Sequence, residues 1–398
     1  MSSGGAAGRG LDWHNFFIAN VQTGFGPFVA VYLSSQAWTQ REIGAALSIG
    51  TVAAMASQLP GGALVDALRN KRLAALAACL AIAVSALMLA FLPAWLPVLV
   101  AEVLHGFASC MLAAAIAAMS LALVGRAGLG ERLGRNARFA AMGSGIAAAV
   151  MGAVGSWVSE EAVFWLTAAL MLPAMLALRA IRGTRPAESS AGRAGPGLRQ
   201  AWRLLLGWRV LLFALCVVLF HLANAAMLPL VAGEITKSLG SRASLVIAAC
   251  IVLPQAIVAL ASPFVGRAAD RWGRRPVLLA AFLALPLRAL LLAVVQQPVP
   301  LIVVQMLDGI SAAGFGVMLP LVAADLTRGT NRFTLCIGAF GLAAGLGSTV
   351  STALAGGIAD RSGVPAALLA LAGAGGLAVL LLLAMPETRG QPEAALAV

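Results

Sequence analysis

Between two long apolar runs the chain reads Gly266-Arg-Ala-Ala-Asp270-Arg271-Trp-Gly273-Arg274-Arg275. A weaker version stands between two earlier apolar runs and reads Gly62-Ala-Leu-Val-Asp66-Ala-Leu-Arg69-Asn-Lys71-Arg72. In both stretches a Gly is followed four residues later by an Asp and then by a cluster of basic residues. A short basic segment between apolar runs is typical of a loop that joins two membrane-spanning helices.

The apolar runs on either side are long enough to cross a bilayer. Hydrophobic residues make up 61% of the 398-residue chain and charged residues only 11%, whereas a soluble domain carries about 25% charged residues. Within lipid, a chain that does not close into a barrel can satisfy its backbone hydrogen bonds only by forming helices. We therefore predict an all-α membrane protein with twelve transmembrane helices. The runs fall at 13–33, 42–65, 73–95, 97–124, 139–158, 161–181, 209–231, 243–266, 276–296, 299–324, 333–358 and 364–385.

The order of these runs predicts two halves. Six runs precede an Arg-rich, Gly- and Pro-containing segment, and six follow it. We therefore expect a first six-helix bundle at 1–181, a cytoplasmic linker at 182–206 and a second bundle at 207–398.

Several local patterns recur in the same order in both halves, which indicates a duplicated, pseudo-symmetric unit. Such repeats are typical of secondary transporters, whose substrate site lies near the midplane between the halves. Besides the opening pair, the matches are Glu102-Val-Leu-His105-Gly106 with Gln305-Met-Leu-Asp308-Gly309, Gly134-Arg-Asn-Ala-Arg-Phe139 with Gly329-Thr-Asn-Arg-Phe333, and Gln22 before Pro27 with Asn224 before Pro229.

The distribution of Lys and Arg predicts orientation. Most of the 27 cationic residues lie in the even-numbered connections between spans. The positive-inside rule then places those connections and both termini in the cytoplasm, with the protein in the inner membrane. The odd-numbered connections hold four cationic residues, which are Arg41, Lys237, Arg242 and Arg361.

The distribution of charge, the spacing of cysteines and the motifs present exclude several classes of function. The net charge of +12 is distributed over particular loops rather than one face, so we expect no nucleic-acid partner. The five Cys residues lie in apolar runs without CxxC spacing, so neither disulfides nor a metal site is expected. We find no nucleophile elbow, HExxH motif or phosphate-binding loop, and we expect neither an enzyme nor a cofactor.

The GxxxDRxGRR stretch at 266–275 resembles the loop signature of the major facilitator superfamily (MFS), and the stretch at 62–72 resembles a degenerate copy. The resemblance covers the whole chain and implies the MFS fold. It also implies that the signature acts as a charge clamp on one state of two rocking bundles. The gating residues so implied are Gly62, Asp66, Arg69, Lys71, Arg72, Gly266, Asp270, Arg271, Gly273, Arg274 and Arg275.

Polar residues within the spans are candidates for function, since charge is costly inside a membrane. In the family, helices one, four, seven and ten line the central cavity, and the resemblance places all of the candidates but Arg288 there. The candidates for the substrate cavity and for proton coupling are Glu102, His105, Asp308, Arg288, His221, Asn224 and Gln22.

Depth in the membrane predicts one specific contact among these candidates. Arg288 and Asp308 are each about nine residues from the outer end of their helix, so we expect an ion pair or shared hydrogen-bond network. Glu102 lies nearer the outer mouth, where water could reach it. Asp308 and Glu102 are the expected proton carriers, with His105 as relay or ligand. His14 is expected at the membrane interface.

One segment differs from a motif of the drug exporters, and another resembles a motif of the sugar porters. Drug exporters carry RxxQG in helix four, where this chain has Glu102-x-x-His105-Gly106. After the last span, Pro386-Glu387-Thr388-Arg389-Gly390 resembles the PETKG of sugar porters, and similar segments occur in exporters.

These observations favour a monomeric, proton-coupled secondary transporter that moves a small organic solute outward by alternating access, with the lipid bilayer as its surroundings. A transporter of a divalent metal or metal chelate is one alternative, because His and carboxylate side chains suit such metals. An uptake porter for a metabolite or sugar is a second. A non-transporting, MFS-like receptor is a third.

Overall fold

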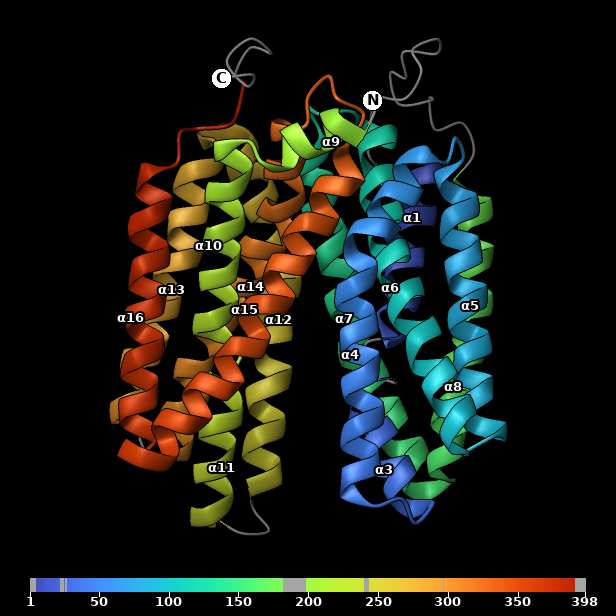
Figure 1. Ribbon diagram of the computed structural model, residues 1–398, viewed down its shortest axis with the longest axis vertical. Helices are drawn as coiled ribbons and strands as arrows, with labels where there is room; N and C mark the ends of the chain where they lie inside the picture. Colours follow the sequence, from blue (N-terminus) through green and yellow to red (C-terminus); the bar gives the residue numbers. More distant parts are fainter. Residues whose placement is uncertain are drawn as a thin grey trace. The chain divides into compact units, whose positions relative to one another are not determined.

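The computed structural model describes residues 5–21, 25, 27–181, 198–239, 243–295 and 297–390 (Figure 1). Two compact units form within it. Unit 1 consists of residues 1–195 together with 331–338, and unit 2 consists of residues 196–330 and 339–398. The segment 331–338, which the sequence division places in the second half, therefore groups with unit 1.

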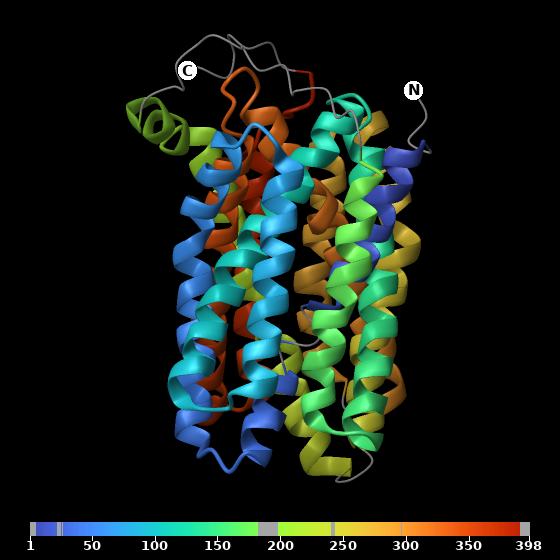
Figure 2. The same cartoon turned by 90° about the vertical axis from the view of Figure 1, so that its right-hand side faces the viewer.

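Unit 1 is a bundle in which helices far apart in sequence pack together. α4 and α5 both pack against α6, while α8 packs against α5 and α1 (Figure 2). α1 also packs against α7. The helices are α1 (Ala6–Ile18), α3 (Pro27–Ser35), α4 (Gln40–Ala67), α5 (Lys71–Phe91), α6 (Trp95–Val124), α7 (Leu129–Trp157) and α8 (Glu160–Arg179).

Unit 2 repeats these pairings. α12 and α13 pack against α14 as α4 and α5 pack against α6, and α16 packs against α13 and α10 as α8 packs against α5 and α1. The predicted pseudo-symmetric repeat is thus present in the packing. The helices are α9 (Leu198–Leu205), α10 (Trp208–Asn224), α11 (Met227–Leu239), α12 (Ala243–Trp272), α13 (Arg274–Val294), α14 (Pro298–Leu326), α15 (Phe333–Ser362) and α16 (Val364–Ala384).

Eleven helices in the described residues are long and apolar enough to cross a membrane. Their outward faces carry apolar side chains such as Leu80, Leu260 and Leu380, which are 50%, 64% and 64% exposed. In water such a surface would be unfavourable, but against lipid it needs no cover. The first predicted span, 13–33, is instead divided between α1 and α3, and residues 22–24 and 26 lie outside the described residues.

Proline explains where the seventh span breaks. α10 ends at Asn224 and α11 begins at Met227, two residues before Pro229. Pro229 has no N–H to donate to the carbonyl four residues earlier, and its ring crowds that carbonyl. The break lies next to Asn224, so this amide side chain stands at an irregular point of the span.

The helices α7 and α9 differ from what the apolar runs predict. α7 begins at Leu129, well before the run predicted at 139–158, because the buried partner of Arg132 allows this basic turn to pack as helix. In the predicted linker at 182–206, residues 198–205 form α9, and residues 182–197 lie outside the described residues.

Candidate functional site

Arg288 of α13 is the most buried charged group in the spans of unit 2. Its side chain is 1% exposed and forms an ion pair with Asp308 of α14, so the predicted pair is present. The same guanidinium nitrogen, Nη1, donates to the Oδ1 of Asn224 on α10 at 2.8 Å. The Asp308 side chain is 26% exposed, and it is therefore the more accessible partner. Three helices thus meet at one buried cation.

His221 lies one turn before Asn224 on α10 and has different neighbours. Its Nδ1 shares a hydrogen bond with the Oγ of Ser348 on α15 at 3.4 Å. The ring packs edge-on against Phe315 of α14, with centroids 5.2 Å apart. Its Nε2 has no partner among the described residues. No hydrogen bond joins His221 to Asp308 in the described part of unit 2, so the two candidates have separate polar partners.

Glu102 of α6 is buried in unit 1, with 5% of its surface exposed. Its carboxyl group lies against Gly50 of α4, where any Cβ would collide with Oε2. Its Oε1 has no hydrogen-bond partner among the described residues. The Glu102 side chain is therefore covered within unit 1, because α4 approaches it closely at this glycine.

His105 lies one turn further along α6 and faces an aromatic ring. The imidazole stacks on Phe25 with centroids 3.7 Å apart and planes 9° apart. It also shares a 3.3 Å hydrogen bond between Nε2 and the Oγ of Ser109. Phe25 was not singled out from the sequence, because a lone Phe in an apolar run carries no pattern. Gln22, the remaining cavity candidate, lies outside the described residues.

His14 is enclosed between two helices of unit 1. The side chain is fully buried, and its Nδ1 lies 2.9 Å from the carbonyl oxygen of Ala174 on α8. α1 and α8 approach closely here because Gly10, one turn earlier, leaves no room for a Cβ against Ala177 and Ala180. His14 thus ties two helices together.

The first signature copy connects α4 to the start of α15 within unit 1. The carboxylate of Asp66 accepts backbone hydrogen bonds from Thr334 at 3.1 Å and from Leu335 at 2.9 Å. These are first-turn N–H groups of α15, which have no partner within the helix, and an anion there is stabilised by the helix dipole. Gly62 allows the contact, since a Cβ there would collide with the carbonyl of Thr334.

Among the basic residues of this copy, Lys71 binds the backbone at the end of α4. The Nζ of Lys71 donates to the carbonyl oxygens of Val65, Asp66 and Leu68 at 2.6, 3.0 and 2.8 Å, which satisfies the C-terminal end of α4. Arg69 is exposed. Asp66 is thus bound by backbone amides at the start of α15, and no ion pair between Asp66 and an arginine occurs among the described residues.

The second copy forms a network at the start of α13 in unit 2. Gly273 has a φ of 103°, which a residue with a side chain rarely adopts, and it turns the chain from α12 into α13. Arg274 is buried and binds Asp270 at 3.1 Å and Asp325 at 2.9 Å. The copy therefore holds α12, α13 and α14 together. Of its other members, Gly266 is buried within α12 and Arg271 is exposed at its end.

The segment after α16 completes this network. Glu387 accepts backbone hydrogen bonds from Arg274 at 2.8 Å and Arg275 at 3.0 Å, while Thr388 donates to Asp325 at 3.2 Å. Burial raises the pKa of Glu387, but the hydrogen bonds from the backbones of Arg274, Arg389 and Arg275 outweigh it, so the pKa is lowered overall. The likeness of 386–390 to PETKG signalled this segment, but its contact with the second copy was not predicted.

A further ion-pair cluster in unit 1 was missed from the sequence. Asp12 of α1 pairs with Arg132 and, at 2.6 Å, with Arg135, both on α7. Arg132 is fully buried and also donates from Nε to the Oδ1 of Asn136 at 2.9 Å. Asp12 precedes the first predicted span, so hydropathy alone gave no reason to place it in the interior.

Comparison with known proteins gives the family. Residues 14–231 and 213–397 each match the family described as Major Facilitator Superfamily. The chain belongs to the Major Facilitator Superfamily. It is 35% identical over 391 residues to the uncharacterized MFS-type transporter MT2531 of Mycobacterium tuberculosis, covering 96% of this chain and 93% of that relative.

Solved structures show that this MFS transporter also shares the fold. The human organic anion transporter MFSD10 matches with a TM-score of 0.75 and 15% identity, covering 95% of this chain and 99% of that one. The MFS transporter FucP matches with a TM-score of 0.72 and 15% identity, covering 95% and 98%. The predicted family and fold are therefore confirmed. The protein is a multi-pass membrane transporter and not an enzyme.

Proposed function

We propose that this MFS transporter exports a small organic solute by alternating access in exchange for protons, acting as a monomer in the inner membrane with both termini in the cytoplasm. The observation that carries the proposal is the ion pair between Arg288 and Asp308, with Asn224 as a third partner. Transporters need groups whose charge changes at a site inside the membrane, and this pair supplies one.

The asymmetry of the pair supports proton coupling. Arg288 is almost completely buried, whereas Asp308 is partly exposed, so a proton reaches the carboxylate more easily than the guanidinium. Protonation of Asp308 would leave a buried cation without its counter-charge, which is strongly unfavourable. A solute group that binds the ionised carboxylate of Asp308 would therefore compete with the proton for the same group. Alternation between proton and substrate at one carboxylate gives exchange, which is the reason to favour export.

Glu102 offers a second proton carrier, with His105 beside it on α6. A buried carboxyl group without a partner is costly in its ionised form, and Glu102 has no cationic partner among the described residues. The ring of His105 is held between Phe25 and Ser109, which suits a fixed relay or a ligand for the solute.

Gating is proposed to involve the cap that Asp66 forms on α15. This helix begins in unit 1 and continues into unit 2. Release of the two amide hydrogen bonds would free the start of α15, so the cap favours whichever transport state contains it.

Transport by purified protein in proteoliposomes, with a pH-sensitive dye trapped inside, tests the proposal. Candidate solutes are first chosen by a thermal-shift screen of metabolites, siderophores and drugs. An active solute should drive proton movement in the wild type, and Asp308→Asn should abolish that coupling. Asp360→Asn, an exposed acid in the same unit, is the matched control and should behave as the wild type.

The outcomes separate the alternatives. Solute flux that ignores the pH gradient and is unchanged in Asp308→Asn would exclude the coupling. Flux in the same direction as protons would indicate uptake of a metabolite or sugar, and the absence of flux with binding retained would indicate a receptor. Among the described residues no three His, Cys, Asp or Glu side chains converge as metal ligands, so no observation favours the metal alternative.

A further inference from the structure

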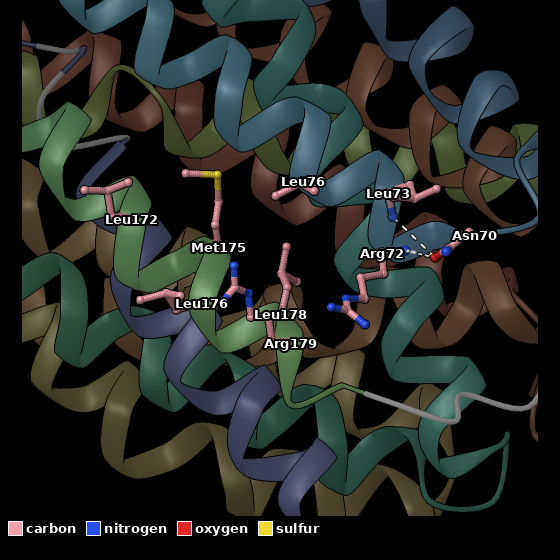
Figure 3. A pocket seen from close by; sticks show the side chains of 9 residues that line it. All are labelled: Asn70, Arg72, Leu73, Leu76, Leu172, Met175, Leu176, Leu178 and Arg179. Atoms are coloured by element: carbon pink, nitrogen blue, oxygen red, sulfur yellow. Dashed lines mark hydrogen bonds between the residues drawn. The ribbon is translucent and has the colours of Figure 1, made fainter.

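A cavity of about 590 Å³ lies between α5 and α8 in unit 1 (Figure 3). α5 begins at Lys71 and α8 ends at Arg179, so the cavity is formed where the two antiparallel helices reach the same membrane boundary. This place is distinct from the buried polar groups of α6. Its lining residues are Asn70, Arg72, Leu73, Leu76, Leu172, Met175, Leu176, Leu178 and Arg179.

The cavity combines positive charge with apolar surface. Among the described residues, Arg72 and Arg179 are the charged side chains that line it, and their guanidinium groups lie on either side of Leu178 (Figure 3). In the described part of the chain neither guanidinium has an ion-pair or hydrogen-bond partner. The Asn70 side chain, in contrast, is occupied in capping α5 through the N–H groups of Arg72 and Leu73. Two uncompensated cations are therefore presented at one end.

The apolar part of the cavity faces outward from the bundle. Leu73, Leu172 and Leu176 are 57%, 60% and 55% exposed although they line the cavity. In a transmembrane bundle such side chains meet acyl chains. A ligand that fills the whole cavity therefore needs an anionic head at the level of the two arginines and a hydrocarbon chain beside the leucines.

We propose that this cavity is a binding site for an anionic phospholipid, whose phosphate group is held by Arg72 and Arg179 and whose acyl chain lies along α5 and α8. Basic pockets between transmembrane helices recognise anionic headgroups in this way, and juxtamembrane basic residues attract them electrostatically. A free phosphate ion would satisfy the arginines and leave the exposed leucines without a role. The signature residue Arg72 thereby gains a partner outside the protein.

Native mass spectrometry of the full-length protein in detergent tests the site, with phosphatidylglycerol and phosphatidylcholine of matched acyl chains as probes. Phosphatidylglycerol should bind more tightly. Arg72→Gln and Arg179→Gln should each weaken its binding about fivefold, the effect of one basic residue near an anionic surface. The charge-conserving variants Arg72→Lys and Arg179→Lys should retain most of the affinity.

Arg138→Gln is the matched control, because Arg138 is an exposed arginine of the same unit that does not line the cavity. It should leave phosphatidylglycerol binding unchanged. Equal binding of the two lipids, or an equal loss in Arg138→Gln, would overturn the proposal. Displacement of phosphatidylglycerol by inorganic phosphate at matched concentration would do so as well, because it would identify a free-anion site. Unfolding midpoints of the lipid-free variants show whether each one is folded.

Discussion

At the scale of single residues, the transporter keeps few charges inside its spans and surrounds each one differently. Arg288 is balanced by Asp308 and Asn224, whereas Glu102 is covered by α4 at Gly50 and has no ionic partner among the described residues. A balanced pair contributes to stability only while both members are present, because the remaining partner of a broken pair stays buried and charged. The two environments therefore give different expectations for substitution.

Replacement of either member of the Arg288–Asp308 pair should destabilise unit 2. Asp308→Asn leaves the almost fully buried Arg288 without a counter-charge, and we expect a loss of about 3 kcal/mol in unfolding free energy, near the lower limit for buried pairs because Asp308 is partly exposed. Arg288→Gln combined with Asp308→Asn should recover part of that loss. Thermal unfolding in detergent provides the measurement.

Asp360→Asn controls for the removal of a negative charge alone and should change stability by less than about 0.5 kcal/mol. If Asp308→Asn proves as stable as this control, the pair contributes nothing and its proposed role in coupling loses its physical basis.

At the scale of helices, charged residues act mainly at helix ends. Asp66 caps α15, Glu387 caps α13, and Lys71 binds the last carbonyls of α4. Each interaction joins an orphan backbone group to a side chain of opposite charge, which is where the helix dipole makes such contacts favourable. The first signature copy caps α15 through its own Asp66, whereas α13, at the second copy, is capped by Glu387 from the segment after α16.

Asp66→Asn should loosen the start of α15. The loss of a charged helix cap costs about 0.5–2 kcal/mol, which corresponds to a roughly two- to thirtyfold rise in the open population. Cys336 reports this opening, because it is fully buried in the same segment. Its alkylation by N-ethylmaleimide, followed by peptide mass spectrometry, should accelerate by that factor in the variant. Asp360→Asn should have no effect, and an unchanged rate in Asp66→Asn would show that the cap does not hold the segment closed.

At the scale of the whole molecule, the chain is two units built on one packing plan. The same helix pairings recur in unit 1 and unit 2, as expected for a duplicated six-helix element. Orientation in the membrane follows from charge rather than from packing, so it requires a test in intact cells.

Cysteine labelling should establish the orientation. Val158 lies in the connection between α7 and α8, and Ala127 lies between α6 and α7. In a Cys110→Ala background, in which the remaining cysteines are buried, Val158→Cys should react with a membrane-impermeant maleimide added to intact cells. Ala127→Cys should react only after lysis, because positive connections remain inside. The reverse pattern would invert the proposed topology.

The sequence by itself determined the helical class, the repeat, the family and the short list of intramembrane polar residues. These features can be predicted because apolar runs of about 20 residues must form helices in lipid, and charged residues within such runs are easily recognised. It also predicted the pairing of Arg288 with Asp308 from equal depth. Tertiary structure alone decided that Asn224 joins this pair, that Phe25 stacks on His105, that Asp12 holds Arg132, and that Glu387 caps α13. These contacts join residues far apart in the chain, and they depend on how closely helices approach at positions such as Gly50 and Gly62, which periodicity does not encode.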